Sequence, residues 1–493
     1  MTTIWSAADD TDTRPALPPD HRHDIVVVGA GLTGLVTALL LAEAGRDVAV
    51  LEGRRIGDGT TGLTTGKVSL LQSTRAGRIA ERCSLGALRT YLEANRAGQR
   101  WLLDFCATHG VDVQHRDAIT YAQTPAAGED VRAEFELTRA AGLPTEYVPA
   151  LDTPFPFHGG VRLADQAQLD PRALLRALAA ALDTRGVPVY EFTRVRGVGW
   201  EPRGDHLVHT DRADLRAGAV VLATGTPILD RGGFFARVTA QRSYLSAFRV
   251  AEALPPQMLI SADSPTRSLR TVPHAGGELL LVGGNGHEVG RAEDTAALVT
   301  DLVDWTRLHF PTAEPLASWS AQDYSPVGEL PYAGPLLPGS DRLLLATGYS
   351  KWGLTNGVAA AHVLAGRLTG TAPSWAEVFT TWQPPDLSTL ASAASANAAV
   401  AQHLTLGWLN GLRTDGQVRP GEGCGRVHRQ GLRPVATSTV DGVTTSVSAV
   451  CPHLYGLVRW NSAEKSWDCP LHGSRFAPDG SVLEGPATEP LGR

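Results

Sequence analysis

Residues 24–34 read Asp-Ile-Val-Val-Val-Gly-Ala-Gly-Leu-Thr-Gly, an apolar run that ends in a glycine-rich turn. The apolar residues that follow recur at helical spacing, at Leu35, Ala38, Leu39 and Ala42. This pattern predicts a buried strand, a tight turn and a helix that starts inside the turn. Strand, turn and helix in this order are the fingerprint of a dinucleotide-binding α/β unit.

Each glycine of the turn is expected to have its own role. Gly29 permits the tight bend, Gly31 lets the backbone approach a pyrophosphate, and Gly34 allows the helix to pack closely on the strand. The helix N-terminus, at Leu32 and Thr33, supplies N–H groups and the positive end of the helix dipole. We therefore expect these five residues to form the nucleotide site.

A second predicted strand, residues 47–51, ends in Glu52, where the fingerprint expects a carboxylate for ribose hydroxyls. Gly53 and Arg54 follow directly and are expected in the same site. The fingerprint alone does not distinguish FAD from NAD. A further glycine-rich run, residues 284–290, has the wrong spacing for a second nucleotide site, and we interpret it as a loop.

Short β-rich runs alternate with helical segments from about residue 24 to about residue 370, which predicts an α/β core. The predicted buried strands are 25–28, 48–51, 219–223, 279–282 and 343–346. Two of them run into Ala-Thr-Gly turns, at 223–225 and 346–348. After the second turn the chain continues as Tyr-Ser-Lys-Trp-Gly-Leu-Thr-Asn-Gly into a predicted helix over 358–368.

The last part of the chain has a different character. An Ala-rich stretch at 390–412 predicts a connecting helix, and the Gly, Asp and Pro residues of 413–423 predict a hinge. The rest is turn-rich, with β-prone runs such as 444–450, and is typical of a small all-β module. We therefore predict an α/β unit at 1–375, a linker helix at 376–412 and a separate module at 413–493.

The module carries a metal-binding pattern. Residues 451–453 read Cys-Pro-His, and residues 469–472 read Cys-Pro-Leu-His. One cysteine and one histidine from each of two loops suit a two-iron centre, with both thiolates on one iron and both imidazoles on the other. Zinc is the alternative, but zinc modules usually present a cysteine pair followed by a histidine pair. The expected ligands of a [2Fe-2S] cluster are Cys451, His453, Cys469 and His472.

A mononuclear iron site, as in Rieske oxygenases, is not expected. Such a site needs two histidines and a carboxylate. No Asp-x2-His-x4-His pattern precedes the cluster motif, and the chain is too short after His472 to supply one.

The glycine turn at 29–34, the strand at 220–225 and the turn at Gly348 together resemble the FAD-dependent amine and amino-acid oxidases. These form the D-amino-acid oxidase, glycine oxidase and sarcosine oxidase superfamily. The resemblance implies an α/β fold in which a Rossmann-like FAD-binding domain carries an inserted mixed-sheet substrate domain. It also implies that the nucleotide is FAD.

The same resemblance implies further contacts with FAD. The turn after Gly348 would close over the flavin ring, the small-residue loop 57–69 would lie against pyrophosphate and flavin, and Val195 would contact adenine. The residues concerned are Thr60, Thr61, Thr65, Gly66, Lys67, Val195, Thr224, Gly225, Gly348, Gly353, Leu354 and Thr355.

Three residues are the candidates for catalysis. Lys351 lies in the turn where glycine oxidase-like enzymes hold a basic group for a substrate carboxylate, although a solvent-facing lysine is the alternative. Arg242 and Tyr244 lie where the superfamily places a strand of its substrate domain, and packing on that strand is the alternative. Trp319 and Asp323 are further candidates of the same kind.

The residues around the cluster motif resemble Rieske domains, through Gly473-Ser474, a turn at 479–480 and Gly485-Pro486. Taken whole, the chain resembles the bacterial FAD-dependent oxidoreductases with a C-terminal Rieske domain.

Two departures from the respiratory Rieske proteins bear on the potential of the cluster. Those proteins have a disulfide-forming cysteine in each loop, where this chain has Gly456 and Leu471. They also donate hydrogen bonds from a serine and a tyrosine, of which this chain keeps Ser474 but has Phe476 at the second position. Fewer donors predict a reduction potential in the lower part of the Rieske range of roughly −150 to +300 mV.

Composition excludes several classes of partner. A formal charge of −7 gives no basic footprint for nucleic acid. Residues 1–24 lack the features of a secretory signal, and the most apolar stretch, 35–44, is too short to cross a bilayer. Five scattered cysteines do not form a disulfide framework. We expect a cytoplasmic protein that binds neither nucleic acid nor membrane, while its oligomeric state stays open.

A flavin accepts two electrons as a hydride, whereas a Rieske centre carries one at a time. The fusion therefore predicts oxidation of a C–N bond in an amine or amino-acid-like small molecule, with electrons leaving singly to a ferredoxin-like or other one-electron partner. One alternative is a reductive flavoenzyme or monooxygenase that a ferredoxin-like donor feeds through the cluster. Another is a non-catalytic electron-transfer or redox-sensing protein.

Overall fold

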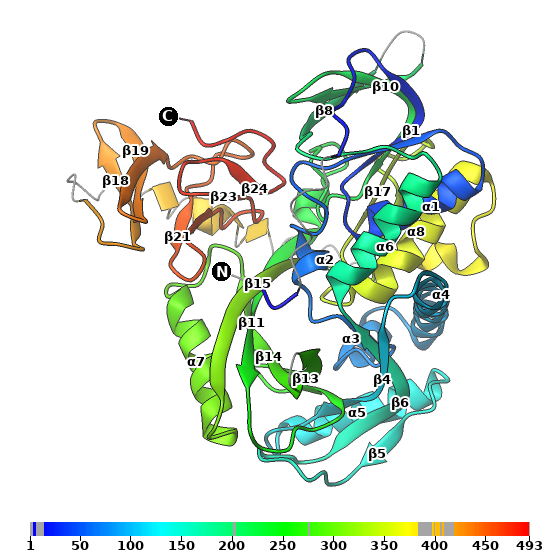
Figure 1. Cartoon of the computed structure of the whole chain (residues 1–493), viewed down its shortest axis with the longest axis vertical. Helices are drawn as coiled ribbons and strands as arrows, with labels where there is room; N and C mark the ends of the chain where they lie inside the picture. Colours follow the sequence, from blue (N-terminus) through cyan, green and yellow to red (C-terminus); the bar gives the residue numbers. More distant parts are fainter. Residues whose placement is uncertain are drawn as a thin grey trace.

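The computed structural model describes residues 3–5, 14–200, 204–274, 277–382, 397–398, 400–404, 407–408 and 419–492. Its described part has an α/β region, a second large sheet next to it, and a small β module beside both (Figure 1). The predicted fold class is confirmed: a Rossmann-like unit with an inserted mixed sheet, followed by an all-β module.

The first sheet orders its strands β16-β17-β10-β1-β2-β7, and β9 and β8 extend it beside β10. Strands β17, β10, β1, β2 and β7 pair in parallel and are largely buried, as expected where helices cover a parallel sheet. The bounds are β1 (Arg22–Val28), β2 (Val48–Leu51), β7 (Val189–Tyr190), β8 (Val195–Trp200), β9 (His206–Thr210), β10 (Leu215–Leu222), β16 (Tyr332–Pro335) and β17 (Leu343–Thr347).

Helices α1 (Leu32–Glu43), α6 (Pro171–Thr184) and α8 (Gly353–Thr369) pack together on this sheet, and α4 (Leu85–His109) packs on α8 (Figure 1). The glycine turn explains how closely α1 approaches β1. Gly29 has a left-handed φ of +105°, and a Cβ on Gly34 would lie 1.9 Å from the Gly29 carbonyl oxygen. Only glycine fits at Gly34, as the sequence predicts for close helix–strand packing.

The second sheet runs β15-β11-β14-β13-β12-β4-β6-β3, with β5 paired to β6. It is antiparallel except for the parallel pair β12 and β4. The bounds are β3 (Lys67–Val68), β4 (Val113–Tyr121), β5 (Glu146–Val148), β6 (Gly160–Leu169), β11 (Val238–Arg249), β12 (Met258–Ser261), β13 (Arg267–His274), β14 (Gly277–Glu288) and β15 (Glu314–Pro326). The helices around it are α2 (Thr60–Leu63), α3 (Arg75–Arg82), α5 (Ala127–Ala140) and α7 (Thr295–His309).

The loop interpretation of residues 284–290 is wrong for residues 284–288, because these complete β14. Gly284 pairs with both β11 and β13, and His287 and Glu288 pair with β11 after a register shift at Asn285, whose φ is +52°. A Cβ on Gly284 would lie 2.3 Å from the Thr266 carbonyl oxygen, so the glycine serves close strand approach. Glycine content was the misleading signal.

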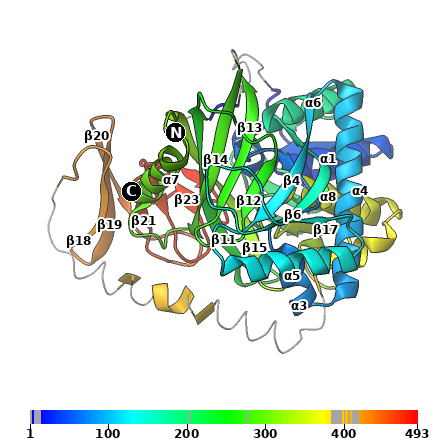
Figure 2. The ribbon, with the colours of Figure 1, turned by 90° about the horizontal axis from the view of Figure 1, so that it is seen from below.

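The C-terminal module contains two antiparallel sheets, β18-β19-β20 and β21-β22-β23-β24. Figure 2 shows it at one side of the molecule, next to α7 and β11. The bounds are β18 (Gly425–Gln430), β19 (Arg433–Val440), β20 (Val443–Ser448), β21 (Arg459–Asn461), β22 (Ser466–Asp468), β23 (Arg475–Phe476) and β24 (Val482–Glu484). Two short 3-10 helices, η1 (Phe234–Ala236) and η2 (Ser374–Phe379), lie in the preceding chain. The predicted linker helix, 376–412, lies largely outside the described residues, so the domain boundaries stay predictions.

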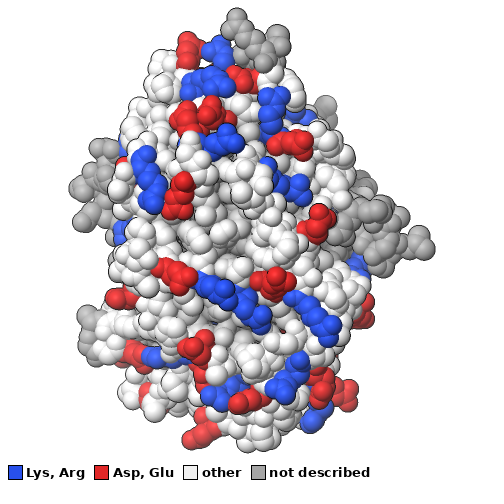
Figure 3. All heavy atoms as spheres, turned by 90° about the vertical axis from the view of Figure 1, so that its right-hand side faces the viewer, with Lys and Arg blue, Asp and Glu red and all other residues white. Residues whose placement is uncertain are grey.

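On the face shown in Figure 3, acidic and basic side chains are interspersed. Within the described ranges, no helix is both long enough and apolar enough to span a bilayer.

Candidate functional site

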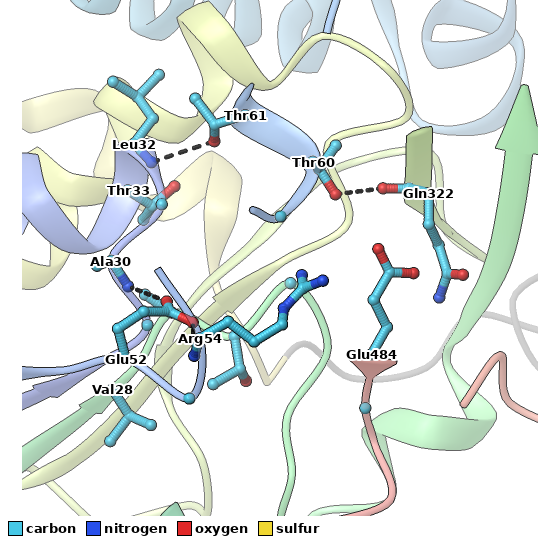
Figure 4. Close-up of a pocket in the computed structure, with 18 of the residues that line it drawn as sticks. Val28, Ala30, Leu32, Thr33, Glu52, Arg54, Thr60, Thr61, Gln322 and Glu484 are labelled. Atoms are coloured by element: carbon cyan, nitrogen blue, oxygen red, sulfur yellow. Dashed lines mark hydrogen bonds between the residues drawn. The ribbon is translucent and has the colours of Figure 1, made fainter. Parts of the chain in front are cut away.

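A pocket opens where β1, β2 and β10 end and their loops meet (Figure 4). Most of the predicted cofactor residues line it, which brings segments distant in sequence to one place. Those residues are Gly29, Gly31, Leu32, Thr33, Glu52, Gly53, Arg54, Thr60, Thr61, Val195, Thr224, Gly225, Gly348, Gly353 and Leu354.

Five predicted cofactor residues do not line this pocket. Gly34 packs α1 on β1, and a Cβ on Gly66 would lie 2.1 Å from the Leu169 carbonyl oxygen. The carbonyl of Thr65 accepts a hydrogen bond from Arg270. Lys67 Nζ donates to the carbonyl of Leu259 at 2.8 Å and to Ser268 Oγ at 2.7 Å, and Thr355 Oγ1 donates to Asn95 Oδ1 at 2.6 Å. These residues hold the second sheet and α8 in place around the pocket.

The pocket suits the phosphates and ribose of a dinucleotide. The N-termini of α1 and α8 both face it, and each presents N–H groups and positive dipole. Glu52 accepts hydrogen bonds from the backbone N–H groups of Ala30 at 2.8 Å and Arg54 at 2.9 Å, which fixes its carboxylate at the turn (Figure 4). Each carboxylate oxygen keeps a free lone pair for a hydroxyl.

Arg194 also lines the pocket, beside Arg54, and sequence reasoning missed it. Burial and the nearby Arg54 lower the pKa of Arg194, whereas Glu52 raises it. The two guanidinium groups add positive charge to the pocket lining. Arg194 directly precedes Val195, the predicted adenine contact, and this adjacency is the signal that could have found it.

Two side chains of opposite charge, Lys351 and Asp323, also line the pocket. Lys351 belongs to a strained turn, with φ of +46° at Ser350 and +74° at Lys351. Such strain in residues other than glycine often marks a functional site. Asp323 lies on β15, and its Oδ2 atom is buried without a hydrogen-bond partner. Burial raises the pKa of Asp323 to about 6, against the attraction of Lys351.

The other candidate catalytic residues lie outside the pocket lining. Tyr244 is fully buried and its ring stacks on His287. The Tyr244 hydroxyl lies 3.2 Å from Nε2 of His287. Trp319 is buried and donates from Nε1 to the carbonyl of Leu63 at 2.8 Å. Both therefore have packing partners in the second sheet. Of the predicted candidates, Lys351 and Asp323 alone meet in the pocket.

Arg242 takes part in an ionic contact between the second sheet and the C-terminal module. It pairs with Glu464 and with Glu484, whose Oε2 lies 3.4 Å from Arg242 NH1. Arg475 pairs with the same Glu464 at 2.6 Å. Glu484 also lines the pocket (Figure 4), together with the neighbouring Leu483 and Gly485 of the module. The module therefore forms one wall of the pocket.

The cluster motif is assembled as its pattern predicts. Cys451 and Cys469 are buried, and their thiols are hydrogen-bonded to each other. The rings of His453 and His472 lie 5.1 Å apart. The thiols are thus paired with each other and the imidazoles with each other, as a cluster with two unlike irons requires. In the described ranges, no three His, Cys, Asp or Glu side chains converge on one point as a single zinc ion needs.

Two details show that these side chains fit a cluster. The Nδ1 atom of His472 is buried without a hydrogen-bond partner, so its lone pair is free for a metal. Burial and the neighbouring His453 lower the pKa of His472 to about 4, which keeps the imidazole neutral as a ligand must be. Backbone N–H groups of His453 and Leu454 point at Cys451 Sγ, where they support a thiolate.

The residues around the cluster agree with the Rieske comparison. Ser474 makes a hydrogen bond with Cys451 and accepts one from the backbone of Ala487 at 3.0 Å. A Cβ on Gly456 would lie 2.6 Å from the Leu471 side chain, so the two positions that lack cysteine are neighbours. Phe476 is fully buried and offers no hydroxyl.

Comparison with known proteins assigns both parts of the chain. Residues 24–367 match the family described as FAD dependent oxidoreductase, and residues 414–493 match the Rieske [2Fe-2S] domain. A Bacillus subtilis protein named as a Rieske 2Fe-2S iron-sulfur protein, YhfW, is 30% identical over 99% of this chain and 96% of its own length.

Two further proteins resemble the larger part. The glycine oxidase of Pseudomonas aeruginosa is 26% identical over 71% of this chain and 95% of its own length. The crystal structure of glycine oxidase from Geobacillus kaustophilus superposes with a TM-score of 0.62 and 20% identity, over 74% of this chain and all of that one. That structural likeness supports the fold.

Proposed function

Because the chain belongs to the FAD dependent oxidoreductase family and carries a C-terminal Rieske [2Fe-2S] domain, we propose that it dehydrogenates a C–N bond and exports electrons singly. The substrate is an amine or amino-acid-like small molecule. When bound, FAD accepts the hydride from the carbon next to nitrogen, and the cluster carries the electrons one at a time.

The observation that carries this proposal is that two side chains of opposite charge, Asp323 and Lys351, line the pocket. The unpartnered Oδ2 atom of Asp323 can accept hydrogen bonds from a substrate ammonium or amine. The Lys351 ammonium group, on the turn before α8, can bind a substrate carboxylate. Together the two groups match the two charges of an amino acid and would orient its α-carbon in the pocket.

The N-terminus of α8, which directly follows the turn that holds Lys351, also lines the pocket. Gly353 and Leu354 line it, at the first turn of a helix of 17 residues. Their N–H groups and the helix dipole favour negative charge that develops on a bound group facing them. Glu484 and its neighbours form the wall of the pocket on the side of the Rieske domain.

The exit of electrons through the cluster is supported by the shared wall. Residues Leu483, Glu484 and Gly485 of the Rieske domain line the pocket, while Cys469 and His472 of the same domain are predicted cluster ligands. The two cofactor sites therefore share one domain interface. A one-electron acceptor outside the chain, such as a ferredoxin-like protein, completes the proposed reaction.

The test is anaerobic stopped-flow mixing of the purified, fully loaded protein with a panel of amines and amino acids. We expect one class of compound to bleach the flavin and then to reduce the cluster. The EPR signal of the reduced cluster measures the second step. The matched variant Cys469→Ser, which lacks a cluster ligand, should show flavin bleaching without the second phase. Bleaching by reduced ferredoxin alone would support a reductive flavoenzyme, and no response to any small molecule would support a non-catalytic protein.

A further inference from the structure

One loop of the flavin domain connects the pocket to the histidine side of the cluster. It follows β10 and leads to β11, and its residues Thr224, Gly225 and Ile228 line the pocket. Two residues later, Oδ1 of Asp230 lies 2.6 Å from Nε2 of His453. This hydrogen bond crosses the interface between the flavin domain and the Rieske domain, and one of its partners is a predicted iron ligand.

The backbone around Asp230 holds its carboxylate in position. The N–H of Gly233 donates to the carbonyl of Asp230 at 3.1 Å, which closes a turn. Gly232 and Gly233 both have left-handed φ, of +88° and +64°, which a turn of this kind needs. Arg231 donates to the carbonyl of Val198 and ties the turn to β8. Asp230 is thus presented to the Rieske domain from a fixed backbone.

The same loop also covers the histidine rings. Phe235 of η1 makes edge-to-face contacts with both imidazoles, with ring centroids 5.8 Å from His453 and 5.2 Å from His472. The side chain of His453 is only 6% exposed, although that of Asp230 is 55% exposed. The flavin domain therefore buries the imidazole side of the cluster site. Within this covering loop, the carboxylate of Asp230 contacts the predicted ligand His453.

We propose that Asp230 is a positioning residue for His453 and that it lowers the reduction potential of the cluster. An ionised carboxylate at Nε2 makes that nitrogen the donor and leaves the Nδ1 lone pair for iron, which fixes both tautomer and ring orientation. The negative charge opposes the gain of an electron by the cluster and makes the imidazole a stronger ligand to the oxidised iron. The interface between the domains thereby sets the driving force for electron transfer.

The size of the effect follows from the contact and its exposure. Hydrogen-bond partners of metal ligands typically change metal-site properties by about 10–100-fold. Because Asp230 is half exposed, water screens its charge, and we expect the lower end of this range. A roughly tenfold change in the electron-transfer equilibrium corresponds to about 59 mV for a one-electron couple.

The decisive variant is Asp230→Asn in the full-length protein loaded with FAD and cluster. Asparagine can still accept the hydrogen bond but has no charge. A redox titration with chemical mediators, followed by the EPR signal of the reduced cluster, should give a potential about 59 mV higher than in wild type. Asp230→Ala should raise it as well and should shift the EPR g values, because His453 loses its positioning partner.

Asp165→Asn is the matched control. Asp165 on β6 forms a hydrogen-bonded pair with His115 on β4 at 2.7 Å, and these two strands of the second sheet lie away from the Rieske domain (Figure 1). It should leave the potential unchanged. If Asp230→Asn and Asp230→Ala both keep the wild-type potential and EPR spectrum, Asp230 only joins the two domains and the proposal fails. The titration needs no substrate, so its result is independent of the proposed C–N oxidation.

Discussion

Asp323 shows at the scale of one residue how the fold prepares a carboxylate for chemistry. Its ordinary pKa of 3.8 is raised to about 6 by burial, so it is ionised at neutral pH but close to its titration range. A carboxylate in this state can pair with a substrate ammonium group above pH 6. Below that pH it is protonated, and the pairing is lost.

We therefore predict a pH-dependent reductive half-reaction. In wild type, the second-order rate constant for flavin reduction by substrate should fall as pH drops through about 6. Asp323→Asn should lower it by about 10–100-fold at neutral pH, as expected for loss of a charged hydrogen bond, and should remove the fall. Stopped-flow kinetics between pH 5 and pH 8 measure both. Asp165→Asn serves as control, and an unchanged pH profile in Asp323→Asn would exclude the role.

Residues identified from the sequence are those whose chemistry depends on local pattern. Gly29, Gly31 and Glu52 belong to a continuous strand-turn-helix-strand segment, and Cys451 and His453 lie in one short loop. Arg242 could not be assigned in this way. Its partners Glu464 and Glu484 lie more than two hundred residues away in another domain, and no periodicity relates them. Asp230 was missed for the same reason.

Among the secondary-structure elements, α3 and α5 are joined by Glu134, a contact that no local sequence pattern predicts. Glu134 lies on α5, and its carboxylate accepts hydrogen bonds from the N–H groups of Ala76 at 3.1 Å and Gly77 at 2.8 Å in the first turn of α3. Burial raises the pKa of Glu134 to about 7, although the two N–H groups lower it. The carboxylate thus caps α3 at a cost that depends on pH.

The sign of this dependence follows from linkage. Because the folded pKa of about 7 exceeds the ordinary value of 4.5, the native state binds the proton more tightly than the unfolded state. Stability is therefore lost as pH rises from about 4.5 to about 7, by up to roughly 3 kcal/mol. Glu134→Gln does not titrate, so its melting temperature relative to wild type should rise between pH 5 and pH 8.

Differential scanning calorimetry at these two pH values measures the effect. The control is Glu136→Gln, which changes an exposed glutamate on the same helix and should show no such trend. A constant difference between wild type and Glu134→Gln at both pH values would contradict the prediction.

The elements themselves were predictable where the signal was local. Each predicted buried strand is present, because runs such as Val48–Leu51 are apolar throughout and lie in a covered parallel sheet. The segment 284–288 was assigned wrongly, because its glycines serve contact with β11 and β13, and those neighbours are set by the tertiary fold. The order of the strands in the second sheet has the same origin and could not be read from the sequence.

At the scale of the whole molecule, two glycines allow the flavin domain and the Rieske domain to approach closely. Gly290 has φ +69°, and a Cβ there would lie 2.8 Å from the backbone nitrogen of Pro470, which lies between the predicted cluster ligands Cys469 and His472. Gly473, directly after His472, has φ +82°, and a Cβ there would lie 2.3 Å from Ala240. The flavin domain thus contacts the second loop of the cluster motif closely at both ends, with backbone against backbone at Gly290 and the Ala240 side chain against backbone at Gly473.

Gly290→Ala should therefore loosen the docking of the Rieske domain. We expect both cofactors to be retained. Electron transfer from flavin to cluster should slow by about 10–100-fold, because small displacements of reacting groups slow a reaction by this order. The control is Gly110→Ala, at a nearly equal φ of +67° with no neighbouring atom within 4 Å. Both variants carry the same backbone strain of about 1 kcal/mol, so only the first should affect transfer. Photoreduction of the flavin followed by EPR of the cluster measures the rate.

A pocket with one wall built by another domain imposes an order on biosynthesis. Strand β24 is synthesised after the strands and loops that form the other walls of the pocket, because it follows all of them in the sequence. The nucleotide can enter before β24 is in place, and β24 then encloses it. Maturation of the chain should thus proceed from flavin insertion to closure, and free FAD supplied after closure should exchange slowly.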